Sequence, residues 1–406
     1  MNLVDIILKK KNNNELSYDE LSFFFLSFLN QEVFDYQMSS LLMAITINGL
    51  SINEVIALTD IFVKSGVVYK YNKKVSDKHS TGGIGDTTSF VIAPILASMN
   101  IPVAKMSGRG LGYTGGTIDK LESIPGFKTE LTKEEFYNQV NKIGLVISSQ
   151  TDDLVPLDKV IYALRDVTGT AESMGLIAAS IMSKKIASGA SYIVIDIKYG
   201  SGAFIKTKEE AKEFSKMLIL IGKHFKKDIK TLINEMNAPL SSSIGNSLEV
   251  LEAIEVLKGK KCSLRDISIN IAANIVSMAK KISLKDAKVF CENALDNKSA
   301  YKMFEKWIKT QGGDLSKIKV SDKVITLKSS LEGTIDAVSA INCGRLAMKL
   351  GAGRENKKSK IDYGVGIKLL KNIGDKAKKG EVLAELYVKN LNIKLTDEDL
   401  KIFSIK

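Results

Sequence analysis

The order of apolar and polar residues predicts helices through the first part of the chain. Apolar residues recur every three or four positions in segments such as 17–30, which is the spacing of one helix face. Ser17 is followed three residues later by Glu20, the capping-box pattern of a helix N-terminus. We therefore predict that residues 1–65 are helical.

The pattern changes after about residue 70. Segment 89–99 is apolar on all sides, as in a buried helix, whereas 101–107 and 191–202 hold short apolar runs typical of buried parallel strands. Residues 151–187 return to helical spacing. An α/β region is thus expected to interrupt the helices.

Helical spacing dominates again in the following part of the chain. Residues 207–260 and 265–314 are predicted to be helical, with a weak Gly/Pro/Ser break at 238–246. From about residue 322 polar and apolar residues alternate, as in strands. The stretches "NIGD" (372–375) and "KKGE" (378–381) indicate turns between these strands.

These patterns predict a fold that combines an all-α part with an α/β part. We expect a discontinuous helical domain formed by 1–65 and 157–188, because the early and the later helices would pack together. A mixed α/β domain would follow from 73–150 and 191–320. Residues 322–406 would form a small α+β C-terminal domain.

Composition places the chain among soluble globular proteins of more than one domain. It has 406 residues, of which 45% are hydrophobic and 26% charged. The longest apolar runs, such as 21–29, are too short to span a bilayer, and the N-terminus lacks the pattern of a signal peptide. Cys262, Cys291 and Cys343 are far apart and odd in number. This argues against a disulfide framework or a zinc site, and we expect a cytoplasmic protein that does not associate with membranes.

The net charge of +12 raises the question of an anionic partner. Nearly all of the excess is lysine, since the chain has five arginines, and lysines alternate with glutamates in helical segments such as 207–217. We interpret the charge as a solvated surface, with a polyanion site as the alternative. An arginine-bearing motif of the kind that reads nucleic acid is absent, so no nucleic-acid partner is expected.

Two glycine-rich segments, 78–89 and 107–122, are the first candidates for chemistry. Backbone N–H groups in such turns bind anions when a helix begins there. Side chains that can add hydrogen bonds to a phosphate are Lys78, Ser80, Ser89, Thr117 and, less directly, Thr81. The alternative is a pair of ordinary strand–helix turns without a ligand.

The second glycine-rich segment also matches the dinucleotide fingerprint at Gly110, Gly112 and Gly115. That reading requires an acidic residue at the end of a second strand about 20 residues later. Residues 127–137 instead resemble the start of a capped helix. We therefore do not predict a dinucleotide site.

A third segment, 162–185, carries Arg165, Ser180 and Lys184. Ser180 and Lys184 are four residues apart, so they share one face of a helix. Two cations beside a hydroxyl suit a ligand with several carbonyl oxygens. The alternative is that Lys184 and Lys185 simply face water.

Together, these segments closely resemble the thymidine and pyrimidine-nucleoside phosphorylases. The resemblance runs along essentially the whole chain, and its most specific parts are "KHSTGGIGD", "GRGLGYTGGTIDKLE", "YALRDVTGT" and "IAASIMSKK". In that family a helical domain binds the pyrimidine and an α/β domain binds phosphate, across a cleft that closes on the substrate. The hinges here would lie near 66–76, 150–157 and 186–191.

The resemblance implies a role for each candidate residue. Phosphate would be bound by Lys78, Ser80, Thr81, Ser89 and Thr117, and the base by Tyr162, Arg165, Ser180 and Lys184. His79 would lie between base and phosphate, and the expected catalytic residues are His79, Arg165 and Lys184. The co-substrate is phosphate, and no organic cofactor is expected.

Two positions bear on how far the family pattern extends. This chain has Tyr113 where the family usually has histidine, so a titrating group near pH 7 is replaced by a phenol. Lys105 stands where thymidine-specific members tend to have methionine and broader members lysine. The lysine therefore favours acceptance of both uridine and thymidine as substrates. The alternative is that Lys105 has no role in substrate choice and is simply a positive charge on the phosphate side of the site.

Broad-specificity members also resemble one another in a metal site, usually assigned to potassium or calcium. Its matching positions here are Gly85, Thr87, Leu240, Ser243 and Glu252. Carbonyl oxygens, a hydroxyl and one carboxylate suit a hard cation rather than zinc. The sequence does not choose between K⁺ and Ca²⁺, or decide whether either binds.

The activity implied is the reversible phosphorolysis of uridine, thymidine and deoxyuridine to the free base and a pentose 1-phosphate. A strict thymidine phosphorylase is one alternative, and a phosphoribosyltransferase of the anthranilate type is another. The resemblance also suggests a homodimer formed through the N-terminal helices. The run "FFFLSFL" (23–29) would supply apolar surface for it.

Overall fold

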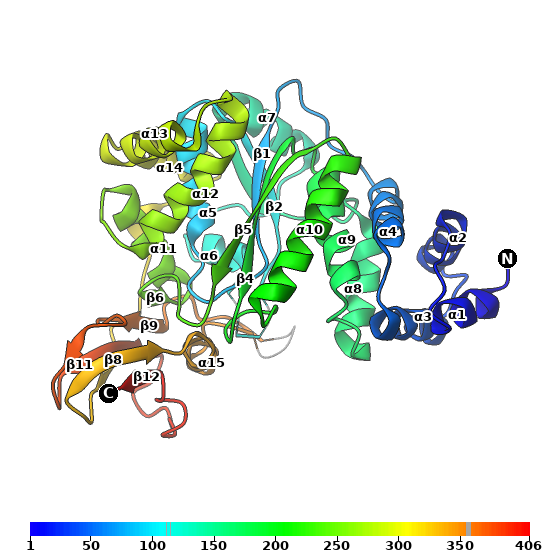
Figure 1. Cartoon of the computed structure of the whole chain (residues 1–406). Helices are drawn as coiled ribbons and strands as arrows, with labels where there is room; N and C mark the ends of the chain where they lie inside the picture. The colour runs from blue at the N-terminus through cyan, green and yellow to red at the C-terminus, as the bar shows by residue number, and fades with distance from the viewer. Residues whose placement is uncertain (111, 114, 355–358) are drawn as a thin grey trace. The chain divides into compact units, whose positions relative to one another are not determined.

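A computed structural model of the chain shows two compact units (Figure 1). The structure describes residues 1–110, 112–113, 115–354 and 359–406. The first unit contains residues 1–77, 151–193 and 212–231, and the second contains 78–150, 194–211 and 232–406. Three of the crossings between them fall at or near the expected hinges, and segment 212–231 adds two that the sequence did not indicate. The three-domain boundaries given above stay a prediction.

The first unit is built mainly from helices. They are α1 (Leu3–Lys11), α2 (Tyr18–Leu29), α3 (Asp35–Asn48), α4 (Ile52–Lys64), α8 (Pro156–Thr168) and α9 (Met174–Ala187). The early helices pack on the later ones, with α4 along α9 and with α2 and α3 against α8. The predicted capping box is confirmed, because Glu20 N–H donates to Ser17 Oγ at 3.2 Å and Ser17 N–H donates to the Glu20 carboxylate at 2.7 Å.

A five-stranded sheet has the order β3-β2-β1-β4-β5. Its strands are β1 (Ser76–Ser80), β2 (Val103–Ser107), β3 (Leu145–Ser149), β4 (Tyr192–Tyr199) and β5 (Asp228–Glu235). β2 and β3 are parallel, and the inner residues of β2 and β4 are buried, which confirms the two predicted strands. The strand order reverses direction between β1 and β4. Such a point in an open α/β sheet is where ligands bind, at the carboxyl ends of the strands.

Besides the buried helix α5 (Thr88–Ser98), the second unit contains further helices before its C-terminal part. They are α6 (Thr117–Glu122), α7 (Lys133–Ile143), α11 (Asn246–Leu257), α12 (Ser263–Lys280), α13 (Leu284–Asp296) and α14 (Ser299–Thr310), followed by the 3₁₀ turn Leu315–Lys317. α12 and α14 pack on α5. Ten of the eleven residues of α5 are buried, as its uniform apolarity predicted. This fixes the N-terminus of α5 against the loop that follows β1.

The prediction that 207–260 is helical on both sides of a break at 238–246 was wrong at 228–235. α10 (Lys208–His224) ends early, and Asp228–Glu235 forms strand β5 at the edge of the sheet. An edge strand is only half covered, and β5 carries lysine, threonine and asparagine between its apolar residues. It therefore lacks the continuous apolar run that revealed β2 and β4.

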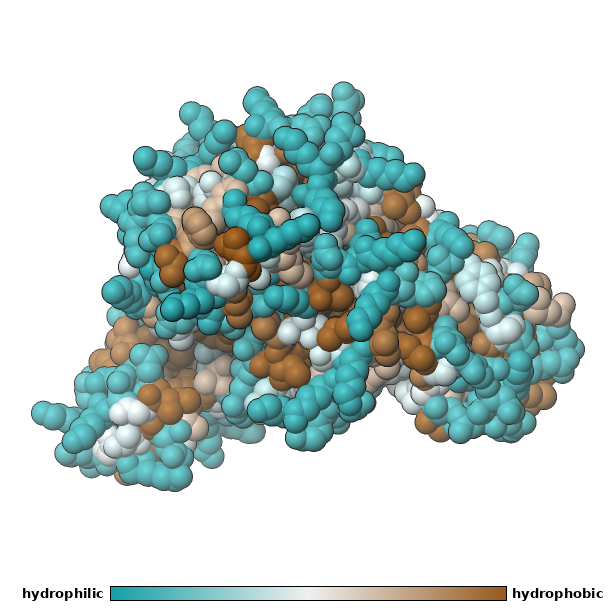
Figure 2. Space-filling model, turned by 45° about the horizontal axis from the view of Figure 1, so that its top comes forward, coloured by the Kyte–Doolittle hydropathy of each residue, from teal (hydrophilic) through white to brown (hydrophobic). Residues whose placement is uncertain are grey.

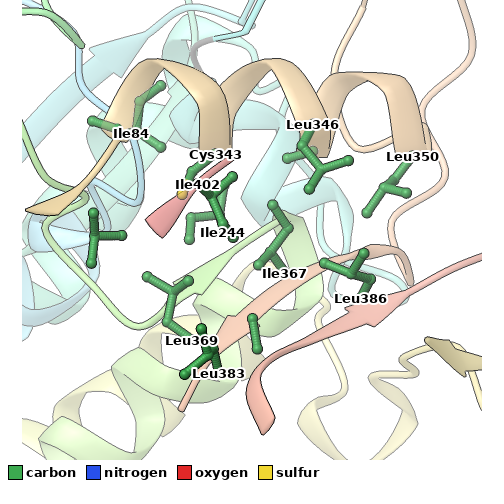
Figure 3. Close-up of a cluster of buried hydrophobic side chains, with 14 of the residues drawn as sticks. Ile84, Ile244, Cys343, Leu346, Leu350, Ile367, Leu369, Leu383, Leu386 and Ile402 are labelled. Carbon is green, nitrogen blue, oxygen red and sulfur yellow. The ribbon is translucent and has the colours of Figure 1, made fainter. Parts of the chain in front are cut away.

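The C-terminal residues form two small sheets and one helix around an apolar core that Ile84 and Ile244 also join. The elements are β7 (Val324–Lys328), β8 (Gly333–Val338), α15 (Ala340–Leu350), β9 (Gly366–Leu369), β10 (Lys376–Ala377), β11 (Val382–Tyr387) and β12 (Phe403–Ile405). The sheet orders are β10-β8-β12 and β6-β9-β11-β7, so that β6 (Ser243–Ile244) pairs antiparallel with this C-terminal part. Figure 3 shows the apolar side chains between α15 and these strands. The predicted turns are confirmed by positive φ angles at Gly374 and Gly380.

The surface is mostly polar, with small apolar groups between the charged side chains on the face drawn in Figure 2. None of the helices that the structure describes is long and apolar enough to cross a bilayer. The run "FFFLSFL" is partly covered: Phe24 and Phe25 are fully buried in the first unit, whereas Phe23, Phe28 and Leu29 are half-buried and Leu26 is exposed. Its role in a homodimer stays a prediction. Further exposed apolar residues of this unit include Tyr36 and Ile47 on α3 and Val167 on α8.

Candidate active site

The loop after β1 begins with a buried lysine that is surrounded by acceptors. Lys78 Nζ donates to Thr88 Oγ1 at 2.6 Å, and it lies 3.5 Å from Asp86 Oδ2 and 3.7 Å from Asp196 Oδ2. Its side chain is 4% exposed. Of these three neighbours, Thr88 forms the short hydrogen bond to the ammonium group. The carboxylates of Asp86 and Asp196 lie farther away and balance its charge.

Two further lysines complete this charged cluster. Lys198 Nζ pairs with Asp196 Oδ2 at 2.6 Å, and both side chains are fully buried. Lys105 Nζ donates to the carbonyl oxygen of Lys78 at 2.6 Å. Burial alone would raise the pKa of Asp86, but the nearby ammonium groups, Lys78 first, hold that pKa well below its usual range. Three lysines thus converge at the start of this loop, which makes it a candidate site for an anion.

The remaining phosphate candidates lie on the same strand, its loop and two helix starts. Thr81 Oγ1 accepts from the backbone N–H of Lys198 at 2.8 Å, which joins the loop to β4. Ser89 is buried in the first turn of α5, and Thr117 is the first residue of α6. Ser80 and His79 are half-buried at the end of β1. All of these except Thr117 belong to the stretch from β1 to α5, so the loop brings most of the predicted phosphate set together.

The second glycine-rich segment is held by charged contacts that the motif did not reveal. Lys120 pairs with Glu249 at 2.6 Å and donates to the carbonyl oxygen of Asp86 at 2.8 Å. Asp119 pairs with Arg354 at 2.6 Å and accepts from the backbone N–H of Gly110 at 2.6 Å. Lys120 therefore ties the two glycine-rich segments together.

Tyr113 has a packing role in this structure. Its ring packs against the C-terminal apolar cluster, and α15 approaches it closely at Gly344. A Cβ on Gly344 would lie 2.8 Å from the Tyr113 carbonyl oxygen, so only glycine fits there. The expectation that the phenol replaces a hydrogen bond of the family's histidine stays a prediction.

The predicted base-binding residues form a second cluster, in the first unit. Arg165 Nε and Nη2 donate to the carbonyl oxygens of Thr170 and Ala171, at 3.1 and 2.7 Å. Lys184 Nζ donates to Ser180 Oγ at 2.8 Å. The Tyr162 ring lies 5.9 Å from Arg165 Cζ and 5.8 Å from Lys184 Nζ, within reach of a cation–π interaction. The structure thus brings Tyr162, Arg165, Ser180 and Lys184 together.

Asp158 belongs to this cluster, and the sequence analysis missed it. Its carboxylate forms an ion pair with Lys184, and it is 1% exposed. Its Oδ1 has no hydrogen-bond partner within the described part of the chain. Asp158, Tyr162 and Arg165 follow one another at spacings of four and three on α8, so they share a face, and this spacing was the available signal.

The electrostatics of the second cluster follow from burial. Burial lowers the pKa of the Arg165 guanidinium, although Asp158 opposes this shift. Burial also raises the pKa of the Tyr162 phenol, and Asp166 adds to the rise. Tyr162 therefore stays neutral at pH 7, while Arg165 stays charged because its usual pKa is above 12.

The five residues of the predicted cation site also lie close together, in the second unit. Strand β6 and the turn before it hold Leu240 and Ser243, and Glu252 follows on α11. Leu240 N–H donates to the carbonyl oxygen of Ile84 at 3.0 Å, which brings this turn beside Gly85. Within the described residues there is no group of three or more His, Cys, Asp or Glu side chains that could hold a metal ion.

Known families match this chain in three places. The family described as "Glycosyl transferase family, helical bundle domain" matches residues 4–66, and "Glycosyl transferase family, a/b domain" matches 72–301. "Pyrimidine nucleoside phosphorylase C-terminal domain" matches 334–399. The matches follow the order of the helical, α/β and C-terminal parts.

Curated relatives match nearly the whole chain. The pyrimidine-nucleoside phosphorylase of Bacillus subtilis (strain 168) is 45% identical over 405 residues, covering 97% of this chain and 93% of the relative. The chain belongs to the pyrimidine-nucleoside phosphorylase family. The enzyme of the same name from Geobacillus stearothermophilus is 44% identical over 399 residues, covering 95% and 92%. The resemblance drawn from the motifs is thus confirmed.

One solved structure shows how far the fold extends beyond the pyrimidine-nucleoside phosphorylases. Anthranilate phosphoribosyltransferase (TrpD) from Thermus thermophilus matches with a TM-score of 0.61, covering 76% of this chain and 99% of that one. The identity is 17%, so the likeness concerns the fold alone. The fold class predicted from the sequence, a helical part with an α/β part and a small α+β C-terminal part, is confirmed.

Proposed function

We propose that this protein catalyses the reversible phosphorolysis of pyrimidine nucleosides. The observation that carries the proposal is a pair of cationic clusters of different chemistry. One, around Lys78, combines lysines with hydroxyls and helix starts, as a phosphate requires. The other combines Arg165, Ser180 and Lys184 beside an aromatic ring, as a flat base with carbonyl oxygens requires. Membership of the pyrimidine-nucleoside phosphorylase family supports the same pairing.

In the proposed reaction a phosphate oxygen forms a bond to C1′ of the pentose while the bond from C1′ to the base nitrogen breaks. The electron pair of that bond leaves with the base, and the sugar passes through an oxocarbenium-like state. Lys78, Ser80 and Ser89 would hold the phosphate against C1′. A fixed phosphate both positions the nucleophile and stabilises the positive charge that develops on the sugar.

The departing base gains negative charge on its carbonyl oxygens. Arg165 and Lys184 are the cations proposed to meet this charge, with Ser180 and Tyr162 orienting the ring. His79 would donate a hydrogen bond or a proton to the base oxygen that lies toward the sugar. Since Lys184 carries an ion pair with the buried Asp158, its ammonium would be held in place before substrate binds.

We propose that uridine, thymidine and deoxyuridine are all substrates, in both directions of the reaction. The support is Lys105, which the resemblance associates with broad specificity. Its Nζ donates to the backbone of Lys78, so its charge belongs to the phosphate cluster, and the link to substrate range stays a prediction. Lys105→Met tests it: narrowing to thymidine would support the link, and an unchanged range would contradict it.

The deciding experiment measures free-base release by UV absorbance with uridine, thymidine and deoxyuridine in parallel, with and without phosphate. We expect release from all three, and only when phosphate is present. Release from thymidine and deoxyuridine alone would indicate a thymidine phosphorylase. No release from any nucleoside would contradict phosphorolysis, and activity on 5-phosphoribosyl pyrophosphate with magnesium would then favour the anthranilate-type alternative.

We also propose that two copies pair through the first unit. Exposed apolar side chains gather on α1, α3 and α8, among them Leu8, Met43 and Ile47, which are 43%, 40% and 74% exposed. α1 and α8 both pack on α3, and an apolar patch on such a surface would mark an interface. Light scattering should give twice the mass of one chain, and a monomer mass at micromolar concentration would contradict the pairing.

A further inference from the structure

A buried serine hydroxyl lies where two carbonyl oxygens of the predicted cation site converge. Ser241 Oγ is 2.8 Å from the carbonyl oxygen of Gly85 and 2.7 Å from that of Ser243. Ser241 is 4% exposed. These are hydrogen-bond distances, and the hydroxyl proton can serve one of the two oxygens at a time.

The other oxygens of the predicted site already have donors of their own. The Glu252 carboxylate accepts the backbone N–H groups of Ser242 and Ser243, at 3.1 and 2.7 Å. The carbonyl oxygen of Leu240 accepts from Ser263 Oγ at 3.2 Å. The Glu252 carboxylate is therefore stabilised by two backbone N–H groups, one in the turn before β6 and one at the start of β6.

The hydroxyl of Thr87 is also engaged. Its Oγ1 lies 3.2 Å from Glu249 Oε2 and 3.4 Å from the carbonyl oxygen of Gly85. Since Glu249 is also paired with Lys120, this hydroxyl belongs to the network that joins the glycine-rich segments. All five predicted ligands thus contact protein donors or acceptors.

A hard cation needs oxygen ligands whose lone pairs are directed at the ion. Ca²⁺ takes six to eight oxygen ligands that point at one empty position, and K⁺ likewise binds oxygen lone pairs. Here Ser241 Oγ fills the space between two of the five oxygens, and the loop is shaped around it. Gly85 has φ +67°, and a Cβ there would lie 2.6 Å from Ser241 Oγ. The residues present do not fit a bound cation.

We propose that the Ser241 hydroxyl takes the place of the cation in this chain. The hydroxyl joins the loop after β1 to the turn before β6, a role that a bound ion would otherwise fill. It cross-links the loop that carries the phosphate candidates to the strand that pairs with the C-terminal sheet. The loop therefore keeps its shape without K⁺ or Ca²⁺.

Thermal unfolding of the full-length protein tests this inference without relying on activity. The wild-type protein is compared in tetramethylammonium chloride, KCl and CaCl₂ at equal ionic strength. We expect midpoints that agree within about 1 °C, whereas a bound ion would raise the midpoint saturably with its concentration. A saturable rise with K⁺ or Ca²⁺ in the wild type would overturn the proposal.

Ser241→Gly provides the complementary measurement, because it removes the hydroxyl and opens the space between the two carbonyl oxygens. We expect its midpoint in tetramethylammonium chloride to fall by about 2–4 °C, since the one hydroxyl donor that lies between the two buried carbonyl oxygens is lost, while the carbonyl oxygen of Gly85 keeps the backbone N–H of Thr87 at 3.1 Å. KCl should then recover part of the loss, because K⁺ can enter the opened space. Tl⁺, used as a substitute for K⁺, should bind in the same space, and thallium NMR would detect it. A midpoint equal to that of the wild type would contradict a structural role for the hydroxyl.

Ser242→Ala is the matched control. Ser242 is the next residue in the same turn, and it contacts Glu252 through its backbone N–H, which alanine retains. Its midpoint should follow the wild type in all three salts. A loss as large as that of Ser241→Gly would show that any change in this turn destabilises the loop, which would contradict the specific role of Ser241. Phosphate-dependent base release, measured alongside, should be equal in KCl and tetramethylammonium chloride for the wild type.

Discussion

The two cationic clusters differ in how many partners each buried carboxylate has. In the second unit Asp86 and Asp196 lie near Lys78, and Asp196 also pairs with Lys198, so the charges form a network. In the first unit Asp158 forms its ion pair with Lys184. Lys78 is 4% exposed, whereas Lys184 is 21% exposed.

The cluster around Lys78 is therefore the more buried and the more highly connected of the two, whereas Lys184 is more open to a ligand. Removing one partner of a buried ion pair is costly because it leaves an uncompensated charge, and this cost is smaller where a second ammonium group lies near the same carboxylate. A single pair is more vulnerable, since removing the lysine leaves the aspartate buried, and the Arg165 guanidinium makes no ion pair with it among the described residues although it acts on it electrostatically. We therefore expect the phosphate cluster to be robust in stability, and the base cluster to be sensitive in both stability and rate.

The largest effect is expected for Lys184→Ala. Loss of a charged contact to the departing base should lower kcat/KM by two orders of magnitude or more, or about 2–4 kcal/mol of transition-state stabilisation. The free energy of unfolding should also fall by about 3 kcal/mol, because Asp158 loses its partner. Steady-state kinetics and urea unfolding measure the two effects separately.

A double variant separates these two effects of Lys184. Adding Asp158→Asn to Lys184→Ala should restore most of the stability but none of the rate, since the amide needs no cation. Lys159→Ala is the control, because Lys159 is an exposed lysine on α8, the helix of Asp158, and is paired with Asp152. Near-wild-type turnover of Lys184→Ala would contradict its catalytic assignment.

Lys78→Ala should affect the phosphate step and spare much of the stability. We expect KM for phosphate to rise and kcat/KM to fall by about two orders of magnitude, because a charge that holds the phosphate is lost. The unfolding free energy should fall by less than in Lys184→Ala, since Lys198 still acts on Asp86 and pairs with Asp196. A larger loss of stability than in Lys184→Ala would overturn the contrast between network and pair.

The smallest effect is expected for Asp158→Asn alone. Lys184 keeps its charge but loses the carboxylate that orients it, so kcat/KM should fall by about tenfold, well short of the loss in Lys184→Ala. Asp158→Glu should recover part of this rate if orientation is the cause. Equal losses for Asp158→Asn and Lys184→Ala would mean that Asp158 does more than position the lysine.

Two groups of residues differ in how well the sequence predicts them. The residues proposed to contact a ligand could be predicted, whereas most of the residues that hold them in place could not. Lys78, Ser89 and Lys184 stand within motifs of glycine, hydroxyl and cation, and such motifs are visible without a structure. Asp158 and Arg354 were missed because their partners are distant in sequence or lie on another helix. The Asp196–Lys198 pair had a signal that was not used, namely two charges inside an otherwise apolar buried strand.

The sequence by itself determined the family, the fold class and the local elements that carry the chemistry. Helix caps, apolar periodicity and glycine turns act over a few residues, so Ser17 and the loop at 78–89 could be interpreted directly. Only the tertiary structure decided which charges meet, that β5 forms the sheet edge, and that Phe24 and Phe25 are core residues. It also decided that the Ser241 hydroxyl reaches Gly85, since a contact across 156 residues depends on packing rather than on local pattern.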